Sequence, residues 1–181
     1  VLHSGISQTL GVSIGLVNTA VGAIIVIIVC LFGEKIGIGT IFNMFMIGLF
    51  MDLILYLDFI PIYQNFWIGT LVLILGLFII SLGTYFYISS AFGAGPRDSL
   101  MVAITRKTNL PVGLCRGILE VSVVIIGWFL GGMVGLGTVI SAFAIGFCVQ
   151  ITFRLLKFDP TQVNHETFGV MIQNLRNLKK N

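Results

Sequence analysis

Five long apolar runs divide this sequence, and each is long enough to cross a bilayer as a helix. About 20 consecutive apolar residues cover the roughly 30 Å hydrocarbon core of a membrane. Short polar or glycine-rich segments separate the runs and are typical of the turns between spans. The predicted spans are residues 12–32, 40–57, 65–92, 112–130 and 138–156.

The segment between the third and fourth runs breaks the apolar pattern. Gly93, Gly95 and Pro96 should end the helix that precedes them. Asp98 or Ser99 is then predicted to cap a new helix, because a short oxygen side chain accepts from the free N–H groups of a first turn. That helix has room for about ten residues and a rise of about 15 Å. We therefore predict a half-length helix, re-entrant or at the membrane interface.

Composition places the chain among integral membrane proteins. Hydrophobic residues make up 57% of the 181 positions and charged residues 9%, whereas soluble domains carry about 25% charged residues. The fold class is therefore predicted as an all-α, polytopic transmembrane bundle whose first partner is the lipid bilayer. The net charge of +3 does not indicate nucleic acid, since the basic residues lie at the ends of apolar runs.

No motif of catalysis or cofactor binding stands out. The three cysteines fall inside predicted spans without the spacing of a metal site. The chain shows no phosphate-binding loop, zinc-protease motif or nucleophile elbow. We expect no enzyme activity, no metal and no cofactor.

An internal repeat is the most specific pattern in the chain. A shift of 98 residues lays Gly-x-Gly-Thr at 37–40 on the same motif at 135–138, without a gap. Residues 1–58 are predicted as the first repeat and residues 62–157 as the second. A complete repeat would contain three spans. The first repeat would then lack its leading span, so we expect about 30–40 further residues before Val1. Other matched pairs are Gly15 with Gly113, Gly33 with Gly131, and Gly48 with Gly146.

The distribution of charge predicts the topology. With five spans, segments 33–39 and 93–110 and the tail 158–181 share one side, and this side carries the basic residues. The opposite side, with residues 58–64 and 131–137, carries no Lys or Arg. The positive-inside rule makes the tail cytoplasmic in a multi-pass plasma-membrane protein. Three spans per repeat give the repeats opposite orientation, an architecture of many secondary transporters.

Glu120 lies in the middle of the predicted span 112–130. An ionised carboxylate at that depth costs several kcal/mol unless it is paired, hydrated or protonated. Arg116 lies one helical turn away and is expected to pair with it. One interpretation is a site for substrate, ion or proton; the other is a structural ion pair or a protonated packing residue.

Further site candidates surround the helix break. Gly95, Pro96, Arg97 and Asp98 combine free N–H groups with a positive charge, which favours anions, although ordinary capping also explains them. Asp52 lies in the outer part of its helix, where it either joins the site or only reaches the interface. The candidate substrate-binding residues are thus Glu120, Arg116, Gly95, Pro96, Arg97, Asp98 and Asp52, and His3 shows no partner.

Glycines form a second pattern, on the span that carries Glu120. Their spacing alternates between four and three, which places them on one helix face where small residues let another helix approach closely. Simple helix packing explains them. The predicted packing glycines are Gly113, Gly117, Gly127 and Gly131, with Gly15 and Gly22 on the equivalent helix of the first repeat.

The sequence resembles the YczE/YitT-like family of bacterial integral membrane proteins. The resemblance rests on the Gly-x-Gly-Pro-x-Asp-x-Leu pattern, which Gly93, Gly95, Pro96, Asp98 and Leu100 match, and on the Gly-x-Gly-Thr turns. It extends to about residue 160 and implies a polytopic plasma-membrane protein, usually of uncharacterised activity. It brings no established catalytic residues.

Two functional hypotheses follow. The first is a transporter or permease for an unknown small solute, with its site between two inverted units. The alternative is a non-transporting scaffold that docks a partner enzyme through its basic face and the tail 158–181. The oligomeric state stays open, with a homodimer among the alternatives.

Overall fold

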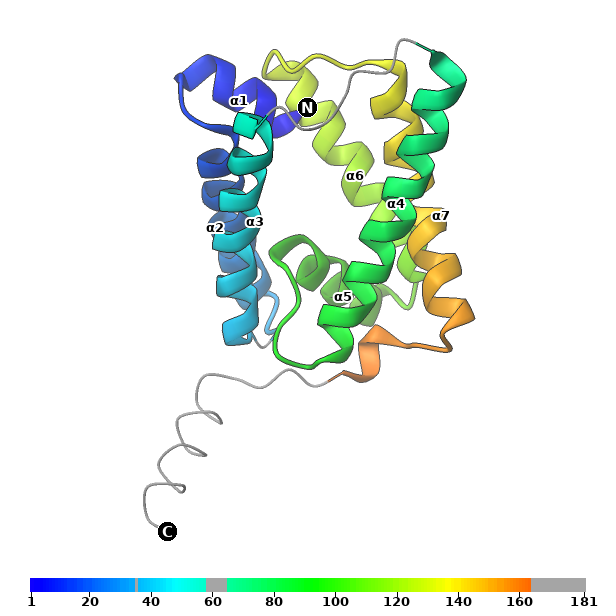
Figure 1. The fold of residues 1–181 in the computed structure, drawn as a ribbon. Helices are drawn as coiled ribbons and strands as arrows, with labels where there is room; N and C mark the ends of the chain where they lie inside the picture. Colours follow the sequence, from blue (N-terminus) through cyan, green and yellow to red (C-terminus); the bar gives the residue numbers. More distant parts are fainter. Residues whose placement is uncertain (35, 58–64, 164–181) are drawn as a thin grey trace.

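The computed structural model describes residues 1–34, 36–57 and 65–163, and within them the chain forms a bundle of α-helices (Figure 1). Five of these helices are long and apolar enough to cross a membrane, namely α2, α3, α4, α6 and α7. The all-α membrane class predicted from the sequence is therefore confirmed. The helices are α1 (Leu2–Leu10), α2 (Ile14–Leu31), α3 (Ile38–Leu57), α4 (Phe66–Ser89), α5 (Pro96–Thr108), α6 (Val112–Phe129) and α7 (Leu136–Leu155), with a 3-10 turn η1 (Pro160–Gln162).

The ends of the spanning helices lie close to the predicted ends, with one exception. Helix α4 ends at Ser89 rather than at residue 92. Ser90 caps the helix, and Ala91 has a φ of 57°, a left-handed conformation that a helix cannot continue through. Gly93, at φ 140°, then turns the chain toward α5.

Helix α5 is the predicted short helix, but its start differs from the prediction. Pro96 is its first residue and Gly95 its N-cap, so neither Asp98 nor Ser99 caps it. Proline suits this position because the first N–H of a helix has no intrahelical partner. The Asp98 side chain is thereby free to point elsewhere. The helix ends at Thr108, close to the expected length of about ten residues, and Asn109 after it is left-handed at φ 56°.

The 98-residue offset of the sequence recurs in the helix boundaries. Adding 98 to the bounds of α2 and α3 gives those of α6 and α7. The helix starts share a hydrogen bond as well: the Gly15 N–H donates to Asp52 Oδ1 at 2.7 Å, and the Gly113 N–H donates to Gln150 Oε1 at 2.8 Å. Two side chains 98 positions apart thus cap α2 and α6 in the same way.

Packing interleaves the two parts of the chain. Helix α2 packs on α3 and α6 packs on α7, while α4 lies against α7. The two short helices contact the other part: α1 packs on α6, and α5 packs on both α2 and α6. Figure 1 shows α5 between the long helices and α1 near the upper ends of α2 and α3. The core around them is apolar, with Ile88, Met101, Cys115 and Val149 almost fully buried.

Three segments meet at one end of the bundle around Arg106, near the end of α5. Its guanidinium lies 2.6 Å from Glu34, in the turn after α2, and donates to the carbonyl oxygens of Thr161 and Val163 beyond α7. Lys107 lies over the Phe32 ring at 4.5 Å. These turns therefore share one side, as the sequence predicts, and α5 does not cross the bundle. The tail from residue 164 onward lies outside the described residues.

Candidate functional site

Helices α5 and α6 bring four charged side chains together inside the bundle. Arg97 and Asp98 lie in the first turn of α5, while Arg116 and Glu120 are one turn apart near the middle of α6. The break at Pro96 matters for this arrangement. It starts α5 in the interior and so carries two charged residues to the central part of α6.

The four side chains form a continuous chain of ion pairs, which we call the charged cluster. Arg116 Nη1 lies 2.5 Å from Asp98 Oδ1, and Arg116 Nη2 lies 2.9 Å from Glu120 Oε1. Arg97 Nη1 lies 3.2 Å from the same Glu120 oxygen. The pairing of Arg116 with Glu120 that the sequence predicts is thus present. Two guanidinium groups balance two carboxylates, so the cluster carries little net charge.

Burial is deepest at the centre of the cluster. Arg116 and Asp98 are each 8% exposed. Charges taken out of water cost several kcal/mol each unless pairing and hydrogen bonds compensate them. Arg116 is the residue that joins the two carboxylates, and its Nε has no hydrogen-bond partner among the described residues. It therefore keeps one donor available inside the protein.

His3 extends the cluster from α1, and sequence reasoning missed it. Its Nε2 lies 3.4 Å from Arg97 Nη2, although the two residues are 94 positions apart. Burial and the neighbouring Arg97 guanidinium lower the pKa of His3 to about 4. The imidazole is therefore neutral near pH 7 and accepts from Arg97. No local pattern marked this contact, because only the docking of α1 on α6 creates it.

A cavity of about 320 Å³ borders the charged cluster. Its polar wall holds His3, Arg97, Arg116 and Glu120, and α7 adds the hydroxyl-bearing residues Thr138 and Ser141. Among the described residues no group of His, Cys, Asp or Glu side chains could hold a metal ion. The rest of the wall is apolar and comes mainly from α4, α6 and α7: Leu77, Ile80, Val123, Val124, Ala142 and Ile145.

Asp52 lies outside the charged cluster and does not line this cavity. Its carboxylate accepts from the Ser13 hydroxyl and the Gly15 N–H, both at 2.7 Å, at the start of α2. The sequence left open whether Asp52 joins the site or only reaches the interface, and the structure places it away from the charged cluster and its cavity. A carboxylate at the N-terminus of a helix is a cap that the helix dipole favours, and this explains the acid without a ligand.

Gly95 and Pro96 position the cluster rather than line its cavity. A Cβ added to Gly95 would lie 3.3 Å from Asn43 Oδ1, so α5 begins close against α3. A Cβ added to Gly22 of α2 would lie 3.4 Å from the Pro96 ring. The helix break thus packs against α2 and α3 and fixes where Arg97 and Asp98 project.

Close helix approach explains some of the predicted packing glycines. Cβ atoms on Gly15 and Gly113 would lie 2.2 and 2.4 Å from the carbonyl oxygens of Gly48 and Gly146. A Cβ on Gly127 would collide with the backbone of α1 at Leu2. These positions, like Gly22 beside Met44, exclude a larger side chain.

Gly117 and Gly131 behave differently from the other predicted packing glycines. A Cβ on either would meet nothing within 4 Å, so neither packs against a second helix. Gly131 ends α6 with a φ of 84°, a turn conformation that glycine adopts without strain. Gly117 borders an open groove. The glycine spacing on α6 therefore does not describe one continuous packing face.

Comparison with known proteins places the sequence among uncharacterised membrane proteins. The family described as "Family of unknown function (DUF6198)" matches residues 1–154. The chain is 34% identical over 152 residues to the uncharacterized membrane protein YczE of Bacillus subtilis, an alignment that covers 83% of this chain and 69% of the relative. It is 31% identical over 160 residues to an uncharacterized protein of Haemophilus influenzae, covering 88% and 72%. No solved structure matches the chain significantly. The similarity to YczE-like proteins predicted from the sequence is confirmed.

Proposed function

This chain belongs to the DUF6198 family, whose function is unknown, and has five helices able to cross a membrane. From that premise we propose that it transports a small polar solute across the membrane. The charged cluster beside a cavity of about 320 Å³ is the observation that carries this proposal. Ionisable residues within a membrane bundle raise the free energy of the folded protein unless they are paired, and they commonly mark substrate or ion pathways.

The cavity has the composition of a small-solute site. Its wall combines apolar side chains with polar groups in about equal share, and the polar groups come from α1, α5, α6 and α7. Arg116 lines the cavity, and its Nε has no hydrogen-bond partner among the described residues. A polar solute would exchange hydrogen bonds with this cluster and leave when the ion pairs re-form.

The proposed mechanism uses two three-span units of opposite orientation. The shared helix bounds and the paired caps at Asp52 and Gln150 support two equivalent units. Helices α1 and α5 would act as the broken helices of such transporters, with the cavity near the middle of the membrane. Rocking of one unit against the other would open the cavity to each side in turn.

A Glu120→Gln substitution tests the site directly. In proteoliposomes that take up a solute identified by screening, we expect uptake to fall by about tenfold or more, because the amide cannot pair with both guanidinium groups. Glu34→Gln is the matched control. It makes the same chemical change in a carboxylate that pairs with Arg106 at the end of the bundle, outside the cavity. Uptake by this variant should stay near that of the unmodified protein.

Unchanged uptake of every accepted solute by the Glu120→Gln protein would remove the cavity from the proposal. The absence of uptake for a broad panel of solutes, together with a stoichiometric partner that co-purifies with the chain, would instead favour the scaffold hypothesis. Size-exclusion profiles of both variants must match the unmodified protein before uptake is compared.

Single-cysteine labelling tests the proposed topology. With Cys30, Cys115 and Cys148 replaced by alanine, a cysteine at Met133 should react with an impermeant maleimide in intact cells. A cysteine at Leu110 should react only after the membrane is opened, because the basic side is proposed to face the cytoplasm. Both side chains are exposed, at 80% and 39%. Labelling of both positions from the same side would rule out this topology.

A further inference from the structure

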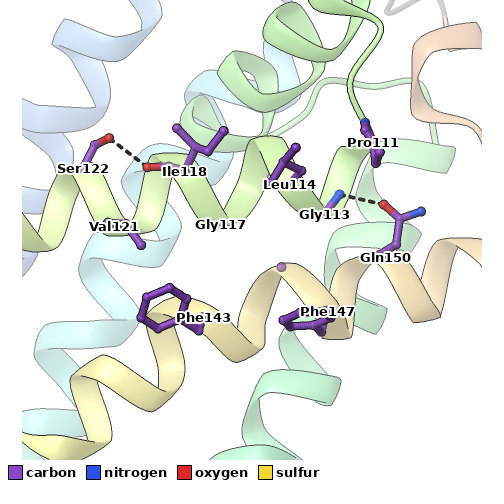
Figure 2. A pocket seen from close by; sticks show the side chains of 11 residues that line it. Pro111, Gly113, Leu114, Gly117, Ile118, Val121, Ser122, Phe143, Phe147 and Gln150 are labelled. Carbon is purple, nitrogen blue, oxygen red and sulfur yellow. Dashed lines mark hydrogen bonds between the residues drawn. The ribbon is translucent and has the colours of Figure 1, made fainter.

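A groove runs between α6 and α7 and shares no lining residue with the charged cavity (Figure 2). It encloses about 530 Å³. Gly117 of α6 leaves the space open, since a Cβ there would meet nothing within 4 Å, and Figure 2 shows the rings of Phe143 and Phe147 on the facing helix α7. These two rings are 61% and 71% exposed, so the groove lies on an outer apolar surface.

One end of this groove joins a basic cavity of about 560 Å³. Pro111 and Gln150 line both spaces, so the two adjoin at these residues. Arg154, in the last turn of α7, and Lys157, just beyond it, line the basic cavity. The apolar groove thus leads toward two positive charges at the end of a spanning helix.

The balance of charge in the basic cavity is positive. Arg154 and Lys157 are exposed, and neither has a carboxylate within 4 Å among the described residues. Asp159 lines the same cavity and opposes them. Its carboxylate accepts from the Thr161 hydroxyl at 2.6 Å and the Thr161 N–H at 2.9 Å, and the hydroxyl bond lowers the pKa of Asp159. Asp159 is therefore ionised near pH 7 and already hydrogen-bonded, which leaves one net positive charge.

The dimensions fit one leaflet of a bilayer. From Phe143 to Arg154 helix α7 rises about 16 Å, close to half of the roughly 30 Å hydrocarbon core. The equivalent surface of α2 and α3 lacks both features. Thr19 stands where Gly117 stands on α6, and Tyr56 stands where Arg154 stands on α7. The groove and its charges therefore do not follow from the repeat alone.

We propose that the groove and the basic cavity together bind an anionic phospholipid of the membrane. An acyl chain would lie along Gly117 between the two phenylalanine rings, and the phosphate would lie at Arg154 and Lys157. Basic pockets between membrane helices near the cytoplasmic surface bind anionic headgroups in this way. The proposal does not depend on transport, because this site and the charged cavity share no residue.

Native mass spectrometry of the full chain in detergent tests the proposal. Phosphatidylglycerol and phosphatidylcholine with identical acyl chains are the probes, so only the headgroup charge differs. We expect phosphatidylglycerol to bind roughly tenfold more tightly, and we expect Arg154→Gln with Lys157→Gln to abolish that preference. Lys107→Gln is the matched control. It removes a positive charge from the same end of the bundle, at a side chain that lies over Phe32 outside the groove.

A Gly117→Leu substitution tests the apolar groove separately from the basic cavity. Open space surrounds this position, so the leucine should fill the groove without displacing backbone. Binding of both lipids should weaken, with the headgroup preference kept. Equal affinity for the two lipids, or a preference that survives loss of Arg154 and Lys157, would overturn the proposal. A dimer that Gly117→Leu converts to monomer, with lipid binding unchanged, would overturn it too, because a second copy would then occupy the groove.

Discussion

An Asp98→Ala protein is expected to lose about 3–5 kcal/mol of the free energy of unfolding, because the substitution leaves Arg116 buried with one of its two carboxylates removed. Arg116 is 8% exposed and its guanidinium bridges Asp98 and Glu120. Removing one partner of a buried pair costs more than the pair itself contributes, since the remaining charge stays out of water. Denaturant unfolding in detergent micelles, followed by tryptophan fluorescence, measures the loss.

Two comparisons isolate the buried charge from the loss of a side chain. Asp159→Ala removes a hydrogen-bonded acid from an exposed site and should cost far less. The double variant Asp98→Ala with Arg116→Leu should be more stable than the sum of the single losses predicts, since it leaves fewer unpaired buried charges. If Asp98→Ala unfolds at the same denaturant concentration as the unmodified chain, the cluster does not stabilise the fold.

The spanning helices could be predicted from the sequence because the bilayer restricts the backbone to few structures. A backbone in lipid must satisfy its own hydrogen bonds, so an apolar run of sufficient length has to be helical. Prediction failed where local chemistry offered equivalent choices. Asp98 and Ser99 are good capping residues, yet Pro96 starts α5 and releases Asp98 to pair with Arg116.

The charged cluster was predicted only in its local part. Arg116 and Glu120 lie one turn apart on the same helix, so their pairing follows from helical geometry. Their contacts with Asp98 and, through Arg97, with His3 depend on how three helices pack, and hydrophobic periodicity does not determine this. The sequence left two alternatives for Asp52, a place in the site or contact with the interface only. Its hydrogen bonds to Ser13 and Gly15 place it at the start of α2, a contact between helices that local sequence does not determine.

The glycines of α6 also could not be assigned from the sequence alone, because their spacing does not show which of them contacts another helix. Gly113 and Gly117 are one turn apart on α6, and both were predicted to pack against another helix. A Cβ on Gly113 would lie 2.4 Å from the carbonyl oxygen of Gly146 and 2.6 Å from Gln150 Cβ. A Cβ on Gly117 would meet nothing within 4 Å. The two positions therefore provide a matched pair of substitutions on a single helix.

Gly113→Ala is expected to destabilise the chain by about 1–3 kcal/mol or more, because its methyl group must push α7 away or shift the backbone of α6. The same displacement would break the hydrogen bond from the Gly113 N–H to Gln150 that caps α6. Gly117→Ala should leave the stability unchanged or raise it slightly, since alanine is the better helix former by up to about 1 kcal/mol. Thermal unfolding of both proteins in the same detergent measures the difference. Equal unfolding temperatures would mean that α6 and α7 do not approach each other as closely as Gly113 and Gly146 require.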